Sequence, residues 1–369
     1  MGETGRLNQS NLVLVMSNPL KVGVIGVGGI AGTHFPGWNA SEHAELAGLA
    51  DPFPAVLERV AKAQGITKTY EKPEDLIADP DIDIIDICTP SAYHAPLAIA
   101  ALEAGKHVIC EKPLAPTPED ISRMIQARDK SGKYLMTAQH FRFQNDTQAL
   151  KKEIETGMMG DIYHARSWML RRNMLPVGPG FIYKKNSGGG PCIDIGVHIL
   201  DLTLWMMGHP KPVAVSGITQ DKLTRMPGAF SSWGSGVIPQ DMDVEEFASA
   251  FVRFEDGQSL ILEVSWMLHH GMQGKGEDMQ MWLYGTQSGA HWPSNQIVTS
   301  NNETKRHYDT QLSRVSDGME AHAAECVAFA KAISEGAPSP VPAEESRDVQ
   351  SILNGLYLSA AENKEVRIG

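Results

Sequence analysis

The sequence predicts an α/β protein in two parts: an N-terminal Rossmann-type, doubly wound parallel sheet, and a C-terminal α+β domain with an open, mostly antiparallel sheet. From Lys21 to about residue 142, short apolar runs alternate with helix-period segments, which is typical of a parallel sheet. A glycine-rich turn follows the first run directly. After residue 160 long runs succeed one another with hairpin signals between them, which indicates antiparallel pairing.

The N-terminal part has regular alternation. The expected strands are Lys21–Gly26, Glu45–Ala50, Ile84–Cys88, His107–Cys110 and Tyr134–Ala138, and the expected helices are 54–64, 93–104 and 118–130. We expect residues 1–18 to form a disordered tail, 19–142 the dinucleotide-binding domain, and 143–369 the substrate-binding and oligomerisation domain.

The C-terminal part begins with a long strand over 162–170. A hairpin of 247–254 and 258–266 turns at Asp256-Gly257, and further strands are expected at 279–284 and from Ala290. One helix is predicted over 191–207, and two more, about 318–334 and 343–361, complete the chain; we expect the last to pack back on the first domain. Residues 221–240, around Trp233, are predicted to be a surface loop.

The composition excludes some partners and settings. A net charge of −12 over 369 residues disfavours binding to nucleic acid or an anionic membrane. No apolar run approaches the ~20 residues that span a bilayer, and Leu12–Met16 lacks the basic flank of a signal peptide. Four scattered cysteines, at 88, 110, 192 and 326, suit reduced thiols in the cytoplasm.

The turn Gly26-Val-Gly28-Gly29-Ile30-Ala31 has the pattern of a dinucleotide site. Gly26 permits a tight turn, Gly28 a close approach of a pyrophosphate, and the helix that follows offers free N–H groups to the phosphates. Asp51 ends the second strand, where a carboxylate can bind the ribose hydroxyls and repel a 2′-phosphate. NAD is therefore favoured, with NADP possible; a solvated strand-end Asp51 is the alternative.

Two further strand ends carry candidate cofactor contacts. Thr89 and Pro90 follow the third strand, with His94 close behind. Ligands of such sheets bind at the carboxyl ends of strands, so Thr89 is expected near the ribose or pyrophosphate. His94 is expected near the nicotinamide or, equally, in a structural role.

Three residues are candidates for proton handling. Lys112, in Glu111-Lys112-Pro113 after the fourth strand, can hydrogen-bond a substrate hydroxyl and stabilise charge on its oxygen, and Glu111 can orient it. On the predicted 191–207 helix, Asp194, His198, Asp201 and Trp205 share one face. His198 is the candidate general acid/base and Asp194 its orienting or substrate-binding partner. A solvated Lys112 and a core His198 are the alternatives; no metal is expected, since Asp194 and His198 lack further ligands.

The motifs together resemble the glucose–fructose oxidoreductase / inositol 2-dehydrogenase / rhizopine catabolism (Gfo/Idh/MocA) family, from about Lys21 to the end. The resemblance rests on the glycine-rich turn, the Glu111-Lys112-Pro113 segment and the helix start Gly188-Gly-Gly-Pro-Cys-Ile-Asp194-Ile-Gly-Val-His198. It implies NAD(P)-dependent oxidation or reduction of a hydroxyl of a sugar, cyclitol or derivative, and a homodimer or homotetramer built through the C-terminal sheet.

The resemblance also implies roles for individual residues. Lys112, Asp194 and His198 match catalytic positions. Residues that match cofactor-side positions are Gly26, Gly28, Gly29, Asp51, Thr89, Pro90, His94 and Glu111, and Arg142 matches a position near cofactor or substrate. Many members carry Asn where this chain has Gln139 or His140.

The substrate is expected between the first sheet and the 191–207 helix. Trp168, Arg171 and Tyr183 are candidate walls, with Arg172, Phe181 and Lys184 nearby, because aromatic faces and charged donors suit a polyhydroxylated ring. Two alternatives to a dehydrogenase remain: a glycoside-cleaving or epimerising enzyme that uses NAD without net redox change, and a non-enzymatic NAD-binding regulator.

Overall fold

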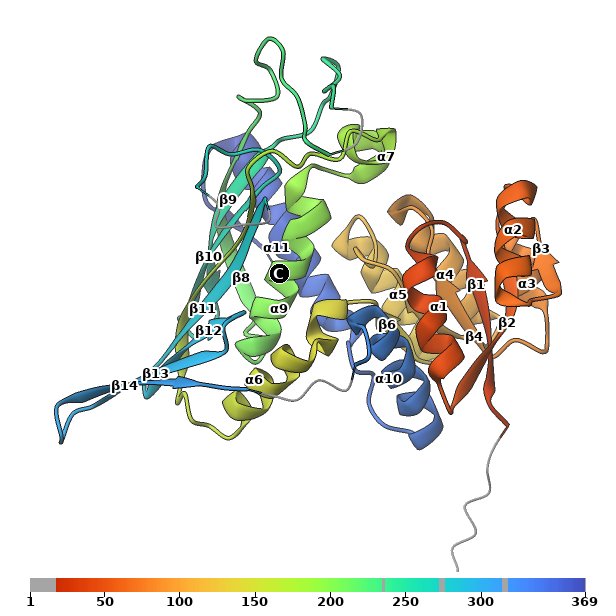
Figure 1. The fold of residues 1–369 in the computed structure, drawn as a ribbon, viewed down its shortest axis with the longest axis horizontal. Helices are drawn as coiled ribbons and strands as arrows, with labels where there is room; N and C mark the ends of the chain where they lie inside the picture. Colours follow the sequence, from red (N-terminus) through yellow and green to blue (C-terminus); the bar gives the residue numbers. More distant parts are fainter. Residues whose placement is uncertain (1–17, 234–235, 272–275, 314–317, 369) are drawn as a thin grey trace, which may run out of the picture.

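The computed structural model describes residues 18–233, 236–271, 276–313 and 318–368, and the predicted N-terminal tail lies outside them except for Asn18. Two sheets stand side by side (Figure 1), and helices from both halves fill the space between them. Both predicted sheet types are confirmed.

The first sheet is parallel, with strand order β3-β2-β1-β4-β5-β6. Its strands are β1 (Leu20–Ile25), β2 (Ala44–Ala50), β3 (Lys68–Tyr70), β4 (Ile84–Ile87), β5 (His107–Cys110) and β6 (Leu135–Thr137). Its helices are α1 (Ala31–Ala40), α2 (Pro54–Gln64), α3 (Pro73–Ala78), α4 (His94–Glu103) and α5 (Pro118–Ser131), and a 3₁₀ turn, η1 (Ser91–Tyr93), precedes α4. The predicted elements therefore agree to within a residue or two; β3 and α3 were not predicted.

Helix α5 shows how the local sequence sets an element. Thr117 accepts a hydrogen bond from Asp120 N at 3.1 Å, Pro118 occupies the first helical position, and Gly132 ends the helix at φ 67°. Such an N-cap contributes about 1 kcal/mol. The helix buries Ile121, Met124 and Ile125 at i, i+3 and i+4 against the sheet.

The second sheet has nine strands in the order β14-β13-β12-β11-β7-β10-β9-β8-β15, and only the β7–β10 pair is parallel. Its strands are β7 (Ile162–Arg171), β8 (Pro212–Gln220), β9 (Phe247–Phe254), β10 (Ser259–Ser265), β11 (Glu277–Gly285), β12 (Ser288–Trp292), β13 (Gln296–Asn301), β14 (Arg306–Gln311) and β15 (Val366–Arg367). The predicted hairpin turns at Gly257, whose φ is 86°.

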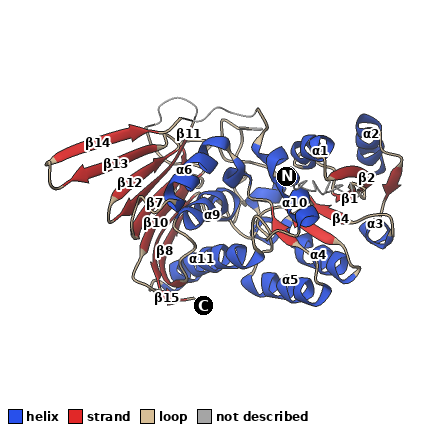
Figure 2. Ribbon diagram, turned by 90° about the horizontal axis from the view of Figure 1, so that it is seen from below, coloured by secondary structure: helices blue, strands red, loops and turns tan. Residues whose placement is uncertain are grey.

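Helices cover one face of this sheet (Figure 2). They are α6 (Asn145–Glu155), α9 (Val197–Met206) and α11 (Ala343–Glu362), with the short turns η2 (His140–Phe143), α7 (Pro179–Ile182), α8 (Lys184–Ser187) and η3 (Cys192–Gly196) around them. Helix α9 is buried almost all round, because α11 and the sheet lie on one side of it and η2 on another.

The last two helices connect the halves. Cys326, Phe329 and Ala330 of α10 (Ala321–Glu335) join the core on the α1 side of the parallel sheet. Helix α11 begins with Ala343 in the core on the opposite face, and continues along α9 and β8. Both closing helices, rather than the last alone, therefore pack on the first sheet.

Candidate active site

The glycine-rich turn joins β1 to α1 with the geometry that a dinucleotide requires. Gly26 has φ 85°, and a Cβ there would lie 2.8 Å from the carbonyl oxygen of Cys88, so only glycine fits. A Cβ on Gly28 or Gly29 would meet nothing within 4 Å, which leaves open space above the start of α1. A pyrophosphate fits in this space against the helix N-terminus.

Asp51 ties this turn to the second strand. Its Oδ2 accepts a hydrogen bond from Val27 N at 3.0 Å and its Oδ1 accepts one from Phe53 N at 2.9 Å. Each carboxylate oxygen can accept a second hydrogen bond. Asp51 is therefore placed to hold the turn and to receive ribose hydroxyls together.

His94 holds two loops together behind the site. It is 1% exposed, and its ring nitrogens lie 2.7 Å from the carbonyl oxygen of Thr89 and 2.8 Å from that of Pro113. Burial lowers the pKa of this imidazole. A neutral imidazole has one N–H, so His94 donates to one of these two oxygens and packs its other nitrogen against the second, which places the ring between the loops after β4 and β5. Thr89 Oγ1, by contrast, is buried without a hydrogen-bond partner among the residues that the structure describes, which is consistent with an atom that binds a ligand.

Lys112 and Asp194 meet across the two halves of the chain. Lys112 Nζ donates to the main-chain oxygen of Asp194 at 3.0 Å and lies 3.5 Å from its carboxylate Oδ1. The indole N–H of Trp266, from the end of β10, donates to Oδ2 of the same carboxylate at 3.2 Å. Lys112 and Trp266 therefore fix the orientation of the Asp194 carboxylate, and Asp194 in turn fixes the position of the Lys112 ammonium.

A pocket of about 370 Å³ opens above this pair. Ile30, Thr89, Pro90, Glu111, Lys112 and Asp194 line it, all named from the sequence. The first half of the chain also contributes Ser91 and Pro113. The C-terminal half closes the pocket with residues of which only Phe181 was named as a substrate-side candidate from the sequence: Gly180, Phe181, Asn186, Ser187, Gly189 and Ile193. The pocket thus lies between the cofactor turn and the helix start at 192.

The predicted 191–207 helix is not a continuous α-helix. Residues Cys192–Gly196 form a π-turn, η3, and only Val197–Met206 are α-helical. The start of the turn is held by the Glu245 carboxylate, which accepts hydrogen bonds from Gly190 N and Cys192 N at 3.0–3.2 Å. A Cβ on Gly190 would collide with Glu245, which explains the glycine. The wider turn sets Asp194 toward Lys112, out of α-helical register with His198.

His198 lies behind the pocket wall and does not line it. The residue is 8% exposed, and its Nδ1 is buried without a partner in the described part of the chain. Its ring packs edge-on against His140 and Phe141, with centroids 5.0 and 5.3 Å away. Burial lowers its pKa, and the nearby Lys112 charge lowers it further, so the neutral form of the imidazole is favoured.

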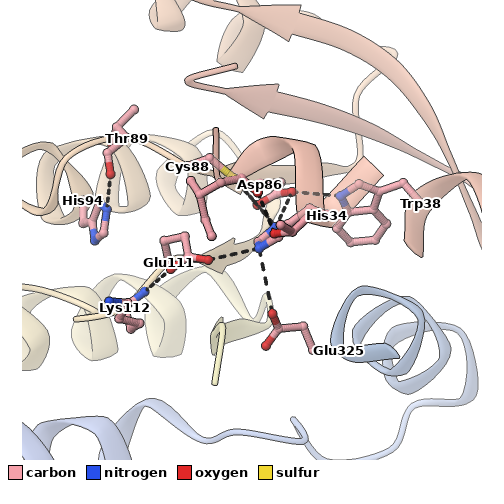
Figure 3. Close-up of polar contacts among 11 residues, drawn as sticks. His34, Trp38, Asp86, Cys88, Thr89, His94, Glu111, Lys112 and Glu325 are labelled. Atoms are coloured by element: carbon pink, nitrogen blue, oxygen red, sulfur yellow. Dashed lines mark hydrogen bonds and ion pairs between the residues drawn. The ribbon is translucent and has the colours of Figure 1, made fainter. Parts of the chain in front are cut away.

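A buried polar network lies beside Lys112 (Figure 3). His34, fully buried on α1, has Nδ1 3.0 Å from Asp86 Oδ2 and Nε2 3.1 Å from Glu111 Oε1. Burial alone would lower its pKa, but the Asp86 charge raises it well above the usual value. Burial likewise opposes ionisation of Glu111, yet His34 and Lys112 lower its pKa to about 2.

This network orients the lysine loop. The Oε2 of Glu111 accepts the Lys112 backbone N–H at 3.0 Å. The indole of Trp38 donates to Asp86 at 2.8 Å. Glu325 is fully buried with its Oε1 3.8 Å from His34 Nε2, and burial raises its pKa well above normal, which favours the protonated form. Glu111 therefore acts on the main chain of Lys112, where an effect on its side chain was expected.

Arg142 is not at the pocket, contrary to its predicted place beside cofactor or substrate. It is 1% exposed, and it donates to Asp201 Oδ2 from Nε at 2.7 Å and to Glu345 Oε2 from Nη1 at 2.5 Å. These ion pairs join η2 to α9 and α11. Arg142 is a structural cation because buried carboxylates on two helices need a counter-charge.

The predicted substrate walls are also distributed differently. Trp168 points to the face of the sheet without helices, where its indole donates to Asp278 at 2.8 Å. Tyr183 donates to Asp241 at 3.0 Å outside the pocket lining. Arg171 is buried at the end of β7, its Nε paired with Glu277 and its guanidinium 5.2 Å from the Trp233 ring. Its Nη1 has no partner among the described residues.

Trp266 and His34, which contact the site, were not singled out from the sequence. Trp266 lies at the end of a predicted strand and carried no signal of its own; only tertiary packing brings it to Asp194. The described residues contain one group with donor atoms close enough for a metal, namely His34, Asp86 and Cys326, within 4.8 Å of one another. It includes neither Asp194 nor His198.

Comparison with known proteins identifies the family. Residues 20–139 match the model for an oxidoreductase family with an NAD-binding Rossmann fold, and residues 147–291 match the GFO/IDH/MocA C-terminal domain. The chain belongs to the GFO/IDH/MocA family. It is an NAD-dependent oxidoreductase.

Named relatives resemble it over all or about half of its length. D-glucoside 3-dehydrogenase of Escherichia coli (strain K12) is 30% identical over 95% of this chain and 98% of its own. Myo-inositol 2-dehydrogenase of Thermotoga maritima is 32% identical over 52% of this chain and 55% of its own. The structure of levoglucosan dehydrogenase in complex with NADH and levoglucosan superposes with a TM-score of 0.79 at 25% identity, covering 95% of this chain and 99% of that one.

Proposed function

We propose that this enzyme oxidises a ring hydroxyl of a sugar, glycoside or cyclitol, with Lys112, Asp194 and His198 as the catalytic residues. One observation carries the proposal: the Lys112 ammonium and the Asp194 carboxylate, from different halves of the chain, meet 3.5 Å apart at a pocket beside the glycine-rich turn. A fixed ammonium next to a fixed carboxylate suits a hydroxyl, which must both accept and donate.

Each residue has a distinct task in this proposal. Bound NAD supplies the hydride acceptor. Lys112 donates a hydrogen bond to the substrate oxygen and stabilises the negative charge that grows there. Asp194 accepts from a substrate hydroxyl and holds Lys112, while Trp266 holds Asp194. His198 follows Asp194 by four residues and does not itself line the pocket, so we assign it the hydroxyl proton through an intervening water during oxidation, and the return of that proton during reduction.

The residues present fit NAD. Three features lie along one edge of the parallel sheet. They are the open space above Gly28 and Gly29, the Asp51 carboxylate, and the Thr89 hydroxyl, which has no hydrogen-bond partner in the described part of the chain. Asp51 favours ribose hydroxyls over a 2′-phosphate, so we propose NAD as the preferred cofactor.

The substrate class rests on the relatives, which include a glucoside, an inositol and a levoglucosan dehydrogenase. The test is to incubate the enzyme and NAD with methyl glucosides, myo-inositol and levoglucosan while following NADH absorbance. Steady NADH formation with at least one of them is expected. Substrate conversion without net NADH would instead identify a redox-neutral enzyme, and no conversion of any polyol would overturn the proposed substrate class.

We also propose that the open face of the nine-stranded sheet forms a homo-oligomer interface. The rings of His164, Trp282, Tyr284 and His291 stack on this face with centroids 4.2–6.4 Å apart. In the described part of the chain all the helices that pack on this sheet lie on its other face (Figure 2). A Trp282→Glu variant should lower the mass measured by light scattering.

The four cysteines are buried and unpaired, which suits the reducing cytoplasm.

A further inference from the structure

Glu245 anchors the π-turn that carries Asp194, although it belongs to the segment just before β9. Its carboxylate accepts hydrogen bonds from Gly190 N at 3.0 Å and from Cys192 N at 3.2 Å. Cys192 begins η3, and Asp194 is the third residue of this turn. The two anchored amides therefore lie directly ahead of the proposed catalytic carboxylate.

A third donor reaches the same carboxylate from α11. The hydroxyl of Tyr357 donates to Glu245 Oε1 at 2.7 Å. Glu245 is 8% exposed, and this burial raises its pKa. The hydrogen bonds from Tyr357, Gly190 and Cys192 act in the opposite direction and favour the ionised form, which can only accept.

The glycines ahead of the turn make room for this arrangement. A Cβ on Gly189 would collide with the Tyr357 hydroxyl, and a Cβ on Gly190 would collide with Glu245. Any larger residue at either position would push the phenol or the carboxylate away from the backbone. The Glu245–Tyr357 pair therefore requires both glycines.

The position of Asp194 depends on the backbone that Glu245 anchors. Asp194 N donates to Gly190 O at 3.1 Å, so a shift of the Gly190 residue moves Asp194 with it. Asp194 in turn holds the Lys112 ammonium with its main-chain oxygen, at 3.0 Å, and receives the Trp266 indole N–H on its carboxylate. Even a small displacement of such a group slows a reaction, because the reacting atoms lose their alignment.

We propose that Glu245 is a positioning residue for the reaction: it fixes the π-turn so that Asp194 faces Lys112, and Tyr357 fixes Glu245. The inference rests on the proposed catalytic roles of Asp194 and Lys112. A carboxylate is needed here because three donors converge on it. A glutamine would present a single acceptor oxygen and an amide group that donates.

The first test uses no substrate. The indole N–H of Trp266 reports on the Asp194 carboxylate, and its NMR resonance in ¹⁵N-tryptophan protein is identified by its loss in Trp266→Phe. In Glu245→Gln this resonance should move toward its position in Asp194→Asn. An unmoved resonance would overturn the positioning role, whether or not the enzyme is active.

The second test is a double-mutant cycle on turnover. Glu245→Gln alone should lower kcat about tenfold, because the proposed catalytic carboxylate loses its fixed position. In an Asp194→Asn background the same change should lower kcat no further, since Glu245 acts through Asp194. Independent, additive losses would show that Glu245 supports only the fold.

Glu246→Gln is the matched control. This neighbouring carboxylate is also buried and also accepts from two backbone amides, those of Leu223 and Thr224, outside η3. The control variant should lose stability in urea but keep both the Trp266 resonance and kcat. Equal shifts of that resonance in Glu245→Gln and Glu246→Gln would overturn the proposal.

Tyr357→Phe tests the same contact if Glu245→Gln does not fold. It keeps the ring and removes one of the three donors, so it should move the Trp266 resonance in the same direction by less. An unmoved resonance would remove Tyr357 from the proposal. A shifted resonance in an enzyme inactive on every polyol would uphold the positioning of Asp194 and overturn only the substrate class.

Discussion

Trp266 donates its indole N–H to the Asp194 carboxylate at 3.2 Å, on the side of Asp194 opposite Lys112. Trp266 is fully buried and lies at the end of β10, so the second sheet, through this one hydrogen bond, sets the angle of a carboxylate on η3. The proposed site therefore depends on three separate segments of chain.

Trp266→Phe should lower kcat about tenfold, as expected when a proposed catalytic group loses its orienting hydrogen bond. The KM for NAD should stay unchanged, because Trp266 does not line the cofactor pocket. Trp292→Phe is the matched control, since that buried indole donates to Thr147 at 3.0 Å, elsewhere in the core. Equal losses of kcat in both variants would mean that Trp266 only supports the fold.

Lys112→Met should abolish turnover, by about 10³-fold or more, because the growing charge on the substrate oxygen loses its cation. NAD should still bind, since the ammonium contacts Asp194 and not the glycine-rich turn. Binding is measured by fluorescence titration and turnover by NADH formation. Lys211→Met, at an exposed ion pair with Glu255, is the control. A variant that loses NAD binding as severely as turnover would refute the proposed role.

Arg142→Met should destabilise the protein by about 3–5 kcal/mol, because it leaves the buried Asp201 carboxylate without its partner. The loss is measured by urea unfolding. Arg128→Met breaks the more exposed pair with Glu344 and should cost about 1 kcal/mol or less. The folded Arg142→Met variant should bind NAD with the same affinity as the parent. A selective loss of NAD affinity would instead support the sequence-based prediction that Arg142 contacts the cofactor.

Stability should fall as the pH drops below about 6.5, the ordinary histidine pKa. The folded state lowers the pKa of His140 to about 3, so the unfolded chain binds a proton that the folded chain refuses between these values. Glu111, with a folded pKa of about 2, adds a further loss as the pH falls from about 4.5 toward 2. Unfolding midpoints of His140→Phe should depend less on pH between 4 and 6.5 than those of the parent, each measured across about ten pH values. If the midpoints of the parent and of His140→Phe changed with pH in the same way, His140 would not be the source of this pH dependence.

Local patterns in the sequence were sufficient for most strands and helices of the first sheet and for the residues placed at the carboxyl ends of its strands. Gly26, Asp51 and Thr89 act within a few residues of a strand end, and the strand order of such a fold brings these ends to one edge. Lys112 was found in the same way.

Tertiary structure decided what the rest of the site contains. The π-turn at Cys192–Gly196, the pairing of Arg142 with Asp201, and the outward direction of Trp168 depend on which elements pack against them. The same holds for the ring contacts of His140 with His198 and His322, since the three residues lie on three elements. Periodicity reports which face of an element is apolar; only packing in three dimensions determines which neighbour that face meets, and therefore which polar groups become partners.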